Sequence, residues 1–304
     1  MRAYEGYGGA FHVEEFESFH ELQRVSQARE LKKCWEGDDH STCQGVQDSG
    51  DRTVKTGEEG RRLVLDGDDR FTALLKEARA EAERHTRDMR FRDVRPKSRL
   101  DVVGGSVNVP RAMMGHPRAM SRRVQEVRDV KSVRVWYDTA CPYWYSSEFR
   151  AKAGAAVMEV VRKLECAGYS VELNSCATFC DKHSSQSKLM MAAAPIKAFR
   201  TPLNDRKAAF PMMSESNLFH LWCWWMHRYP KTWHLSNEGV NAASMGGEYL
   251  KRCRAWCADR GGLFLSIVDI HNDGSGDDVS KMVAYVMKRL VELSEEYGRV
   301  KDAS

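Results

Sequence analysis

The spacing of apolar positions along the chain changes near residue 131. From there, alternation of apolar with polar or bulky residues predicts a strand over 133–138, and a long small-and-apolar run predicts a helix over 147–167 that Gly168 ends. Later runs predict strands over 169–179 and 187–199, short helices within 203–229, a helix over 245–259, an unbroken buried strand over 263–270 and a terminal helix over 278–297. This succession predicts an α/β domain over 131–304 with a mostly parallel sheet.

The first 130 residues have a different pattern. Phe16, Phe19 and Leu22 recur at a spacing of three, which predicts one helix that we place over 11–34. The remaining predictions are a loop over 35–60, a helical turn within 56–67, a mostly solvated helix over 71–89, and extended chain over 100–123 with a short helix after Pro117. We therefore predict an N-terminal helical and irregular region, with a basic connecting arm, over 1–130.

Composition narrows the class of protein. The chain has 304 residues, 42% of them hydrophobic, and eight Trp, so it can bury a large core. A charged content of 30%, without any run of about 18 apolar residues, argues against a membrane protein. The first residues lack the apolar core of a secretory signal, and the nine cysteines have no repeating spacing. These features favour reduced thiols and an intracellular location.

Charge is distributed unevenly. Residues 1–83 have a balance of −7, whereas residues 84–134 have a balance of +9. Clustered cations can bind phosphate, so nucleic acid is a candidate partner of the basic segment. Few aromatic residues occur there, Phe91 being the main one, which disfavours a base-stacking surface. The alternative is that this segment pairs with acidic residues 1–83 of its own chain or of a neighbour. The candidate nucleic-acid residues are Arg84, Arg87, Arg90, Arg92, Arg95, Lys97 and Arg99.

The order of elements after residue 131 resembles the von Willebrand factor A-type fold, a doubly wound sheet. In that fold the first and fourth strands lie side by side, and ligands bind at the carboxyl ends of the strands. Metal-binding members carry D-x-S-x-S after the first strand, with a Thr and a further Asp from other loops around Mg²⁺. This sequence has Asp138, Ala140 and Pro142 at those positions, so both ligand hydroxyls are missing.

A closer resemblance covers most of the chain. It is to phage and prophage proteins of unknown function whose C-terminal half looks like a von Willebrand A-like domain. The matching stretches are "TGEEGRRLVLDGDDRF", "VNVPRAMMGHPRAMSRR", "VWYDTACPYWYSSE", "GYSVEL", "PIKAFRTPLNDRKAAFPMMSESNLFHLW" and the final strand, loop and helix. The resemblance implies a phage-encoded protein, cytoplasmic in the host cell or associated with the virion. It implies no particular activity.

The resemblance places Asp138 and Asp269 on neighbouring strands at one edge of the sheet. Two carboxylates there would favour a hard cation such as Mg²⁺, with Ser146 and Asp273 as further oxygen ligands. Such a site predicts a magnesium-dependent enzyme acting on phosphate or nucleic acid. The alternative is that both aspartates accept hydrogen bonds from turn or helix amides.

Cysteine and histidine offer two weaker candidates. His220, Cys223 and His227 share one side of a predicted helix, and Cys253 with Cys257 could complete a zinc site, although side-chain packing explains them as well. In the second candidate a nucleophilic Cys141 or Cys180 would be activated by His183. No flanking motif of a known cysteine enzyme accompanies these residues.

The hypothesis that the sequence favours is a non-enzymatic module for protein interaction or assembly. It rests on the altered metal motif and on three aromatic residues beside it, Tyr143, Trp144 and Tyr145, which could form a contact surface. The partner would be another protein or a second copy of the chain. The magnesium enzyme and the nucleic-acid binder remain the alternatives.

Overall fold

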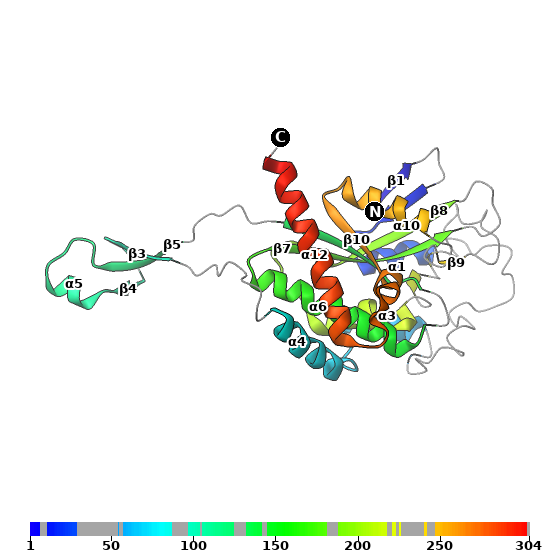
Figure 1. Cartoon of the computed structure of the whole chain (residues 1–304), viewed down its shortest axis with the longest axis horizontal. Helices are drawn as coiled ribbons and strands as arrows, with labels where there is room; N and C mark the ends of the chain where they lie inside the picture. Colours follow the sequence, from blue (N-terminus) through cyan, green and yellow to red (C-terminus); the bar gives the residue numbers. More distant parts are fainter. Residues whose placement is uncertain are drawn as a thin grey trace.

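The computed structural model describes residues 1–6, 11–28, 54, 57–86, 97–103, 105–124, 132–141, 145–180, 188–217, 221, 222, 225, 240, 241 and 247–302. Within this part of the chain there is a main sheet of seven strands and a separate sheet of three. Helices cover the main sheet, and the small sheet lies apart from it (Figure 1).

The main sheet contains both parallel and antiparallel strand pairs. Its path is β1-β2-β8-β7-β6-β10, and β9 pairs with β7 beside this path. The β7–β6, β6–β10 and β2–β8 pairs are parallel, whereas β1–β2, β7–β8 and β7–β9 are antiparallel. The predicted α/β class is confirmed. The strands are β1 (Arg2–Gly6), β2 (Phe11–Glu15), β6 (Ser132–Asp138), β7 (Ser170–Cys180), β8 (Leu189–Lys197), β9 (Val240–Asn241) and β10 (Gly262–Ser266).

Helices pack on both faces of this sheet. Helix α6 contacts α4, α7 and α12 on the lower side of the sheet in Figure 1, and α10 packs against β10 on the upper side. The helices are α1 (Phe19–Ala28), α3 (Gly57–Asp66), α4 (Thr72–Thr86), α6 (Ser147–Cys166), α7 (Asp205–Met213), α8 (Glu215–Asn217), α10 (Gly247–Ala258), α11 (Ile267–Ile270) and α12 (Val279–Asp302). The helices predicted over 147–167, 245–259 and 278–297 are thereby confirmed.

Helix α6 is the central helix of the lower layer. The Ser146 side chain accepts a hydrogen bond from the amide of Phe149 and so caps its start, and Gly168, at φ 89°, turns the chain after its end. At Gly154 a Cβ atom would lie 2.1 Å from the carbonyl oxygen of Met212. The backbones of α6 and α7 therefore approach each other closely at a glycine.

The prediction of one helix over 11–34 is wrong for its first residues. Residues 11–15 form β2, which pairs with β1 on one side and with β8 on the other. Phe11, His12, Val13 and Glu14 are all buried, because both faces of β2 are covered. The helical spacing begins only at Phe16 and belongs to α1. Strands from both sides of the predicted boundary at residue 130 therefore share one sheet.

Helix α4 has most of its residues exposed or half-buried, as predicted, and only Leu75, Ala78 and Ala82 are buried. Its Arg79 pairs with Glu159 of α6 at 3.1 Å. Two other sequence predictions need correction. The short helix of the 100–123 segment, α5 (Val109–Met113), precedes Pro117 because Asn108 caps it and Pro110 lies in its first turn. The strand predicted over 263–270 ends at Ser266, where the chain enters α11.

Residues 97–124 form a projecting element within the basic segment 84–134. From here on, we call this element the arm. It contains β3 (Lys97–Asp101), β4 (Ser106–Val107), α5 and β5 (Met120–Val124), with β5 in the centre of a three-stranded antiparallel sheet. No arm residue belongs to either hydrophobic core cluster of the described chain. In Figure 1 the arm extends away from the body, and α5 lies at its far end.

Candidate functional site

The carboxyl end of β6 is the expected ligand position of such a sheet. Asp138 ends this strand and is fully buried. One of its carboxyl oxygens accepts a hydrogen bond from the amide of Ala140 at 3.1 Å, and the other bonds the Thr178 hydroxyl at 2.7 Å. Burial raises the pKa of Asp138 to about 7, although both hydrogen bonds act in the opposite direction. The side chain is thus enclosed within the fold.

Asp269 lies close to this strand end, but it has a local role. Ser266 pairs in register with Asp138 across the parallel β6–β10 ladder and starts α11. Asp269 completes the capping box of α11 by accepting a hydrogen bond from the Ser266 amide at 3.2 Å, and its other oxygen pairs with Arg254 of α10. Both aspartates therefore accept amide hydrogen bonds, as in the alternative drawn from the sequence.

The predicted magnesium ligands do not form one oxygen cage. Ser146 caps α6, and Asp273 is exposed in the π-helical turn η6 (His271–Ser275). No group of three or more His, Cys, Asp or Glu residues that could hold a metal ion occurs within the described ranges. An Mg²⁺ ion needs several ionised or carbonyl oxygens, so the residues present do not fit that cofactor.

A buried ion pair lies directly behind this strand end. Arg150 of α6 and Glu215 of α8 are 3.2 Å apart, and each side chain is 4% exposed. The Ser147 hydroxyl donates to Glu215 at 2.8 Å, and Arg150 donates to the carbonyl of Tyr145. The sequence analysis missed this network; the signal for it was an arginine among the small and apolar residues of α6. The pair fixes the loop that follows β6 onto the helical layer.

Of the three aromatic residues predicted to form a contact surface, the structure describes Tyr145. Tyr145 stacks on His271 with ring centroids 4.3 Å apart, and Phe149 meets the same histidine edge-on. Tyr145 is 8% exposed, so its ring packs against η6 more than it faces solvent. Tyr143 and Trp144 lie outside the described residues, as does Pro142.

The described residues give little support to a cysteine nucleophile or to cysteine ligands of zinc. Cys141 is buried, and burial raises the pKa of its thiol to about 12, which leaves almost no thiolate at neutral pH. Burial also raises the pKa values of Cys253 and Cys257. His183, His220, Cys223 and His227 lie outside the described residues.

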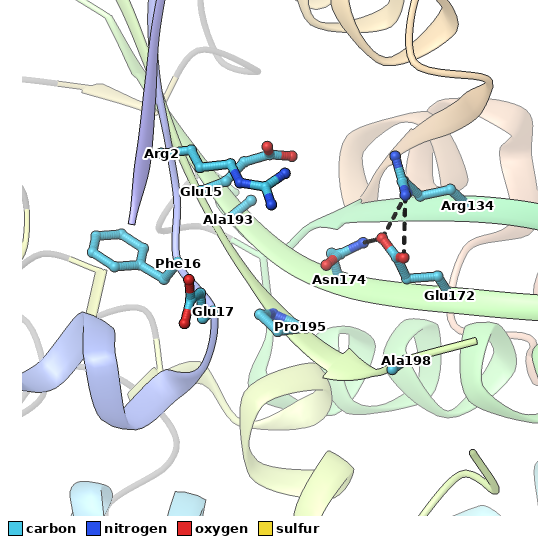
Figure 2. A pocket seen from close by; sticks show the side chains of 10 residues that line it. All are labelled: Arg2, Glu15, Phe16, Glu17, Arg134, Glu172, Asn174, Ala193, Pro195 and Ala198. Atoms are coloured by element: carbon cyan, nitrogen blue, oxygen red, sulfur yellow. Dashed lines mark hydrogen bonds and ion pairs between the residues drawn. The ribbon is translucent and has the colours of Figure 1, made fainter. Parts of the chain in front are cut away.

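A cleft of about 340 Å³ opens on the sheet toward the amino ends of β6 and β7. Figure 2 shows Arg2, Glu15 and Glu17 on one side and Arg134, Glu172 and Asn174 on the other. Arg134 pairs with Glu172 at 2.6 Å, and Asn174 donates to Glu172 at 3.1 Å. The other charged groups of the cleft, Arg2, Glu15 and Glu17, have no side-chain hydrogen bond or ion pair within the described chain. The remaining lining residues are Phe16, Ala193, Pro195 and Ala198.

The arm carries most of the large hydrophobic residues that are exposed in the described part of the chain. Of the eight large hydrophobic residues that are exposed in the described chain, six lie within residues 102–114, and Met113 is 83% exposed. A contiguous exposed apolar surface commonly marks an interaction site. The six residues are Val102, Val103, Val107, Val109, Met113 and Met114.

The candidate nucleic-acid residues are spread over α4, the arm and the segment between them. Arg84 is at the end of α4, where it pairs with Glu81 at 2.6 Å. Lys97 and Arg99 belong to β3, and Arg99 is directly opposite Arg122 in the β3–β5 register. The other four, Arg87, Arg90, Arg92 and Arg95, lie outside the described residues.

Fold and sites together define an α/β protein with a helix-covered sheet and a projecting arm. The aspartate at the carboxyl end of its strand β6 is buried within the fold. The chain belongs to the family described as "Domain of unknown function (DUF7192)", whose model matches residues 10–285. No curated protein and no solved structure matches the chain. No helix in the described part of the chain is both long and apolar enough to cross a membrane.

Proposed function

We propose that this protein is a non-enzymatic interaction or assembly module and that the arm is its main contact element. The observation that carries the proposal is the concentration of exposed apolar side chains on residues 102–114. Large exposed apolar groups are costly unless a partner covers them. The arm adds six basic residues and one acidic residue, so a protein partner with an acidic surface would suit it.

The body of the protein serves as a rigid support in this proposal. We infer a von Willebrand A-like topology for it, supported by β6 and β10 lying side by side and by the antiparallel β7–β8 hairpin beyond them. Buried Asp138 and capping Asp269 are then structural residues at a strand end that has lost its metal ligands. The resemblance to phage and prophage proteins suggests assembly of a phage component as the setting.

Nucleic-acid binding through the basic segment 84–134, which includes the arm, is the second candidate. The observation that favours it is composition: the arm alone contains six basic residues and one acidic residue. Clustered cations of this kind can bind the phosphate backbone of a nucleic acid.

Site-specific photo-cross-linking separates these functions. A photoreactive amino acid at position 113 of the arm is compared with one at position 207, since Lys207 is exposed on α7 of the body. In cells that naturally contain the protein, we expect a discrete protein adduct from position 113 and none from position 207. Absence of an adduct at 113, or an adduct formed only with nucleic acid, would overturn the proposed function.

A further inference from the structure

We infer that the partner of the arm is a second copy of this chain, and that the arm of one copy docks in the cleft beside β1 and β2 of another. The inference rests on the proposed function and names the partner of the same surface. It joins two features that lack partners among the described residues: a basic arm with exposed apolar side chains, and a cleft whose groups without an ion pair are Glu15, Glu17 and Arg2.

The arm supplies an arginine that has no acidic partner in the described chain. Arg118 is exposed, and its side chain has no ion-pair partner within the described ranges. The same arm carries Met113 and Met114, which are 83% and 74% exposed. Such an arm combines charge, which selects an acidic surface, with apolar area, which stabilises the contact once water is removed.

The cleft offers a matching surface. Glu15, at the end of β2, and Glu17, just after it, have no ion-pair partner in the described chain, and Figure 2 shows Arg2 beside Glu15. Ala193 and Pro195 of β8 line the cleft beside them and give it an apolar part. An arginine of the arm could pair with these carboxylates while a methionine covers the apolar part.

The same features disfavour nucleic acid as the occupant of the cleft. The cleft groups without a partner in the described chain are two carboxylates and one guanidinium, Glu15, Glu17 and Arg2, so their net charge is negative and disfavours a phosphate backbone. The arm contains no Phe, Tyr or Trp, and its one ring for stacking on an unpaired base is His116. Its exposed apolar groups extend over 102–114, a larger surface than the few side chains with which minor-groove proteins wedge bases apart.

Docking in trans also agrees with the shape of the molecule. The arm extends away from the body in Figure 1, and its tip is not covered by the described part of its own chain. Two copies could each place an arm in the cleft of the other, which closes a dimer, and one-way docking would give a longer assembly.

The test measures the mass of the purified full-length protein over a range of concentrations by size-exclusion chromatography with light scattering. We expect a mass above the 34.7 kDa of one chain, and a shift to the single-chain mass when residues 97–124 are replaced by a short Gly-Ser linker. The charge-matched contact should also weaken as salt rises. A single-chain mass at all concentrations, or an assembly that persists without the arm, would overturn the inference.

Charge reversal tests the pairing of the arm with the cleft. Arg118→Glu alone and Glu17→Arg alone should each reduce self-association about 10-fold, and the double variant should recover most of the loss. Lys207→Glu, an exposed change on the body, is the matched control and should change nothing. Lack of recovery in the double variant contradicts docking in the cleft.

The outcomes also separate this inference from the proposed function. If the protein is a single chain in solution and position 113 cross-links to a different protein, the second-copy inference fails and the proposed function stands. If position 113 cross-links only to nucleic acid, both fail.

Discussion

Asp138 is the residue whose environment differs most from the sequence expectation. A carboxylate that is meant to hold an ion must be ionised and open to the ligand, whereas Asp138 is fully buried and has a pKa of about 7. Its two hydrogen-bond partners, Thr178 and the amide of Ala140, belong to the protein. Its role at the end of β6 is therefore to satisfy polar groups of the turn.

Replacing Asp138 with Asn should make the stability of the protein less dependent on pH. The pKa of Asp138 rises from 3.8 to about 7 on folding, so the folded state binds its proton more tightly and loses stability as pH rises between these values. Asn keeps the acceptor for the Ala140 amide, its Nδ2 would donate to the Thr178 hydroxyl instead of accepting from it, and it has no charge to bury. We expect the stability advantage of Asp138→Asn to grow by roughly 2–4 kcal/mol from pH 4 to pH 8.

Urea unfolding of both proteins across this pH range measures that advantage. Asp278→Asn is a suitable control, because Asp278 is exposed and accepts the amides of Ser280 and Lys281 at the start of α12. A difference between wild type and Asp138→Asn that stays constant with pH would contradict the burial argument.

The Arg150–Glu215 pair makes a second prediction at the scale of residues. Glu215→Gln leaves the buried Arg150 guanidinium without its carboxylate and should destabilise the protein by about 3–5 kcal/mol. The matched control is Glu248→Gln, whose pair with Lys251 is exposed on both sides and should matter by less than about 1 kcal/mol. Equal losses in denaturant unfolding would show that burial does not set the strength of the pair.

At the scale of elements, the closest helix contact is between α6 and α7 at Gly154. Any Cβ atom at this position would overlap the carbonyl of Met212. We expect Gly154→Ala to lower the unfolding free energy by about 2–4 kcal/mol despite the better helix propensity of Ala. Gly6→Ala, on the edge strand β1 with nothing within 4 Å, should change it by less than about 1 kcal/mol. Thermal unfolding that ranks the two variants equally would refute the close approach.

The sequence pattern correctly predicted the elements in which hydrophobic residues recur at the regular spacing of a strand or a helix. Strand β6 alternates, α6 carries a long small-and-apolar run closed by Gly168, and both have nearly the predicted bounds. The pattern failed where tertiary contacts decide. Residues 11–15 are buried on both faces of a central strand and so show no strict alternation, and Ser266 ends β10 by capping α11 within an apolar run.

The candidate site was less predictable for a physical reason. The resemblance to the von Willebrand A-type fold placed Asp138 and Asp269 on neighbouring strands, whereas Ser266 pairs with Asp138 in the β6–β10 register and Asp269 lies in α11. The sequence could not show that Asp138 would be buried or that Asp269 would pair with Arg254, because both depend on contacts distant in sequence. The exposed apolar groups of the arm were likewise invisible to a pattern that does not distinguish buried from exposed residues.

At the scale of the whole molecule, the body and the arm have separate roles. Because no arm residue belongs to a described core cluster, the body should keep its melting temperature to within about 3 °C when the arm is replaced by a linker. Circular dichroism during heating gives this value. A large loss of stability would mean that the arm is part of the fold rather than an attachment.

Millimolar Mg²⁺ or Mn²⁺ should not stabilise the protein. The predicted ligands Asp138, Ser146, Asp269 and Asp273 serve separate local roles or face solvent, so we expect either ion to shift the melting temperature by less than about 1 °C. A larger shift that disappears in Asp138→Asn would restore the magnesium-enzyme hypothesis.

The central claim is that the protein acts through the exposed tip of its arm. The most direct measurement is photo-cross-linking in the native cell at positions 103, 113 and 114 of the arm and at position 207 of the body. The account predicts a shared protein adduct from the arm positions and none from the body position. Arm positions that give no protein adduct, or no more than position 207 gives, would contradict it.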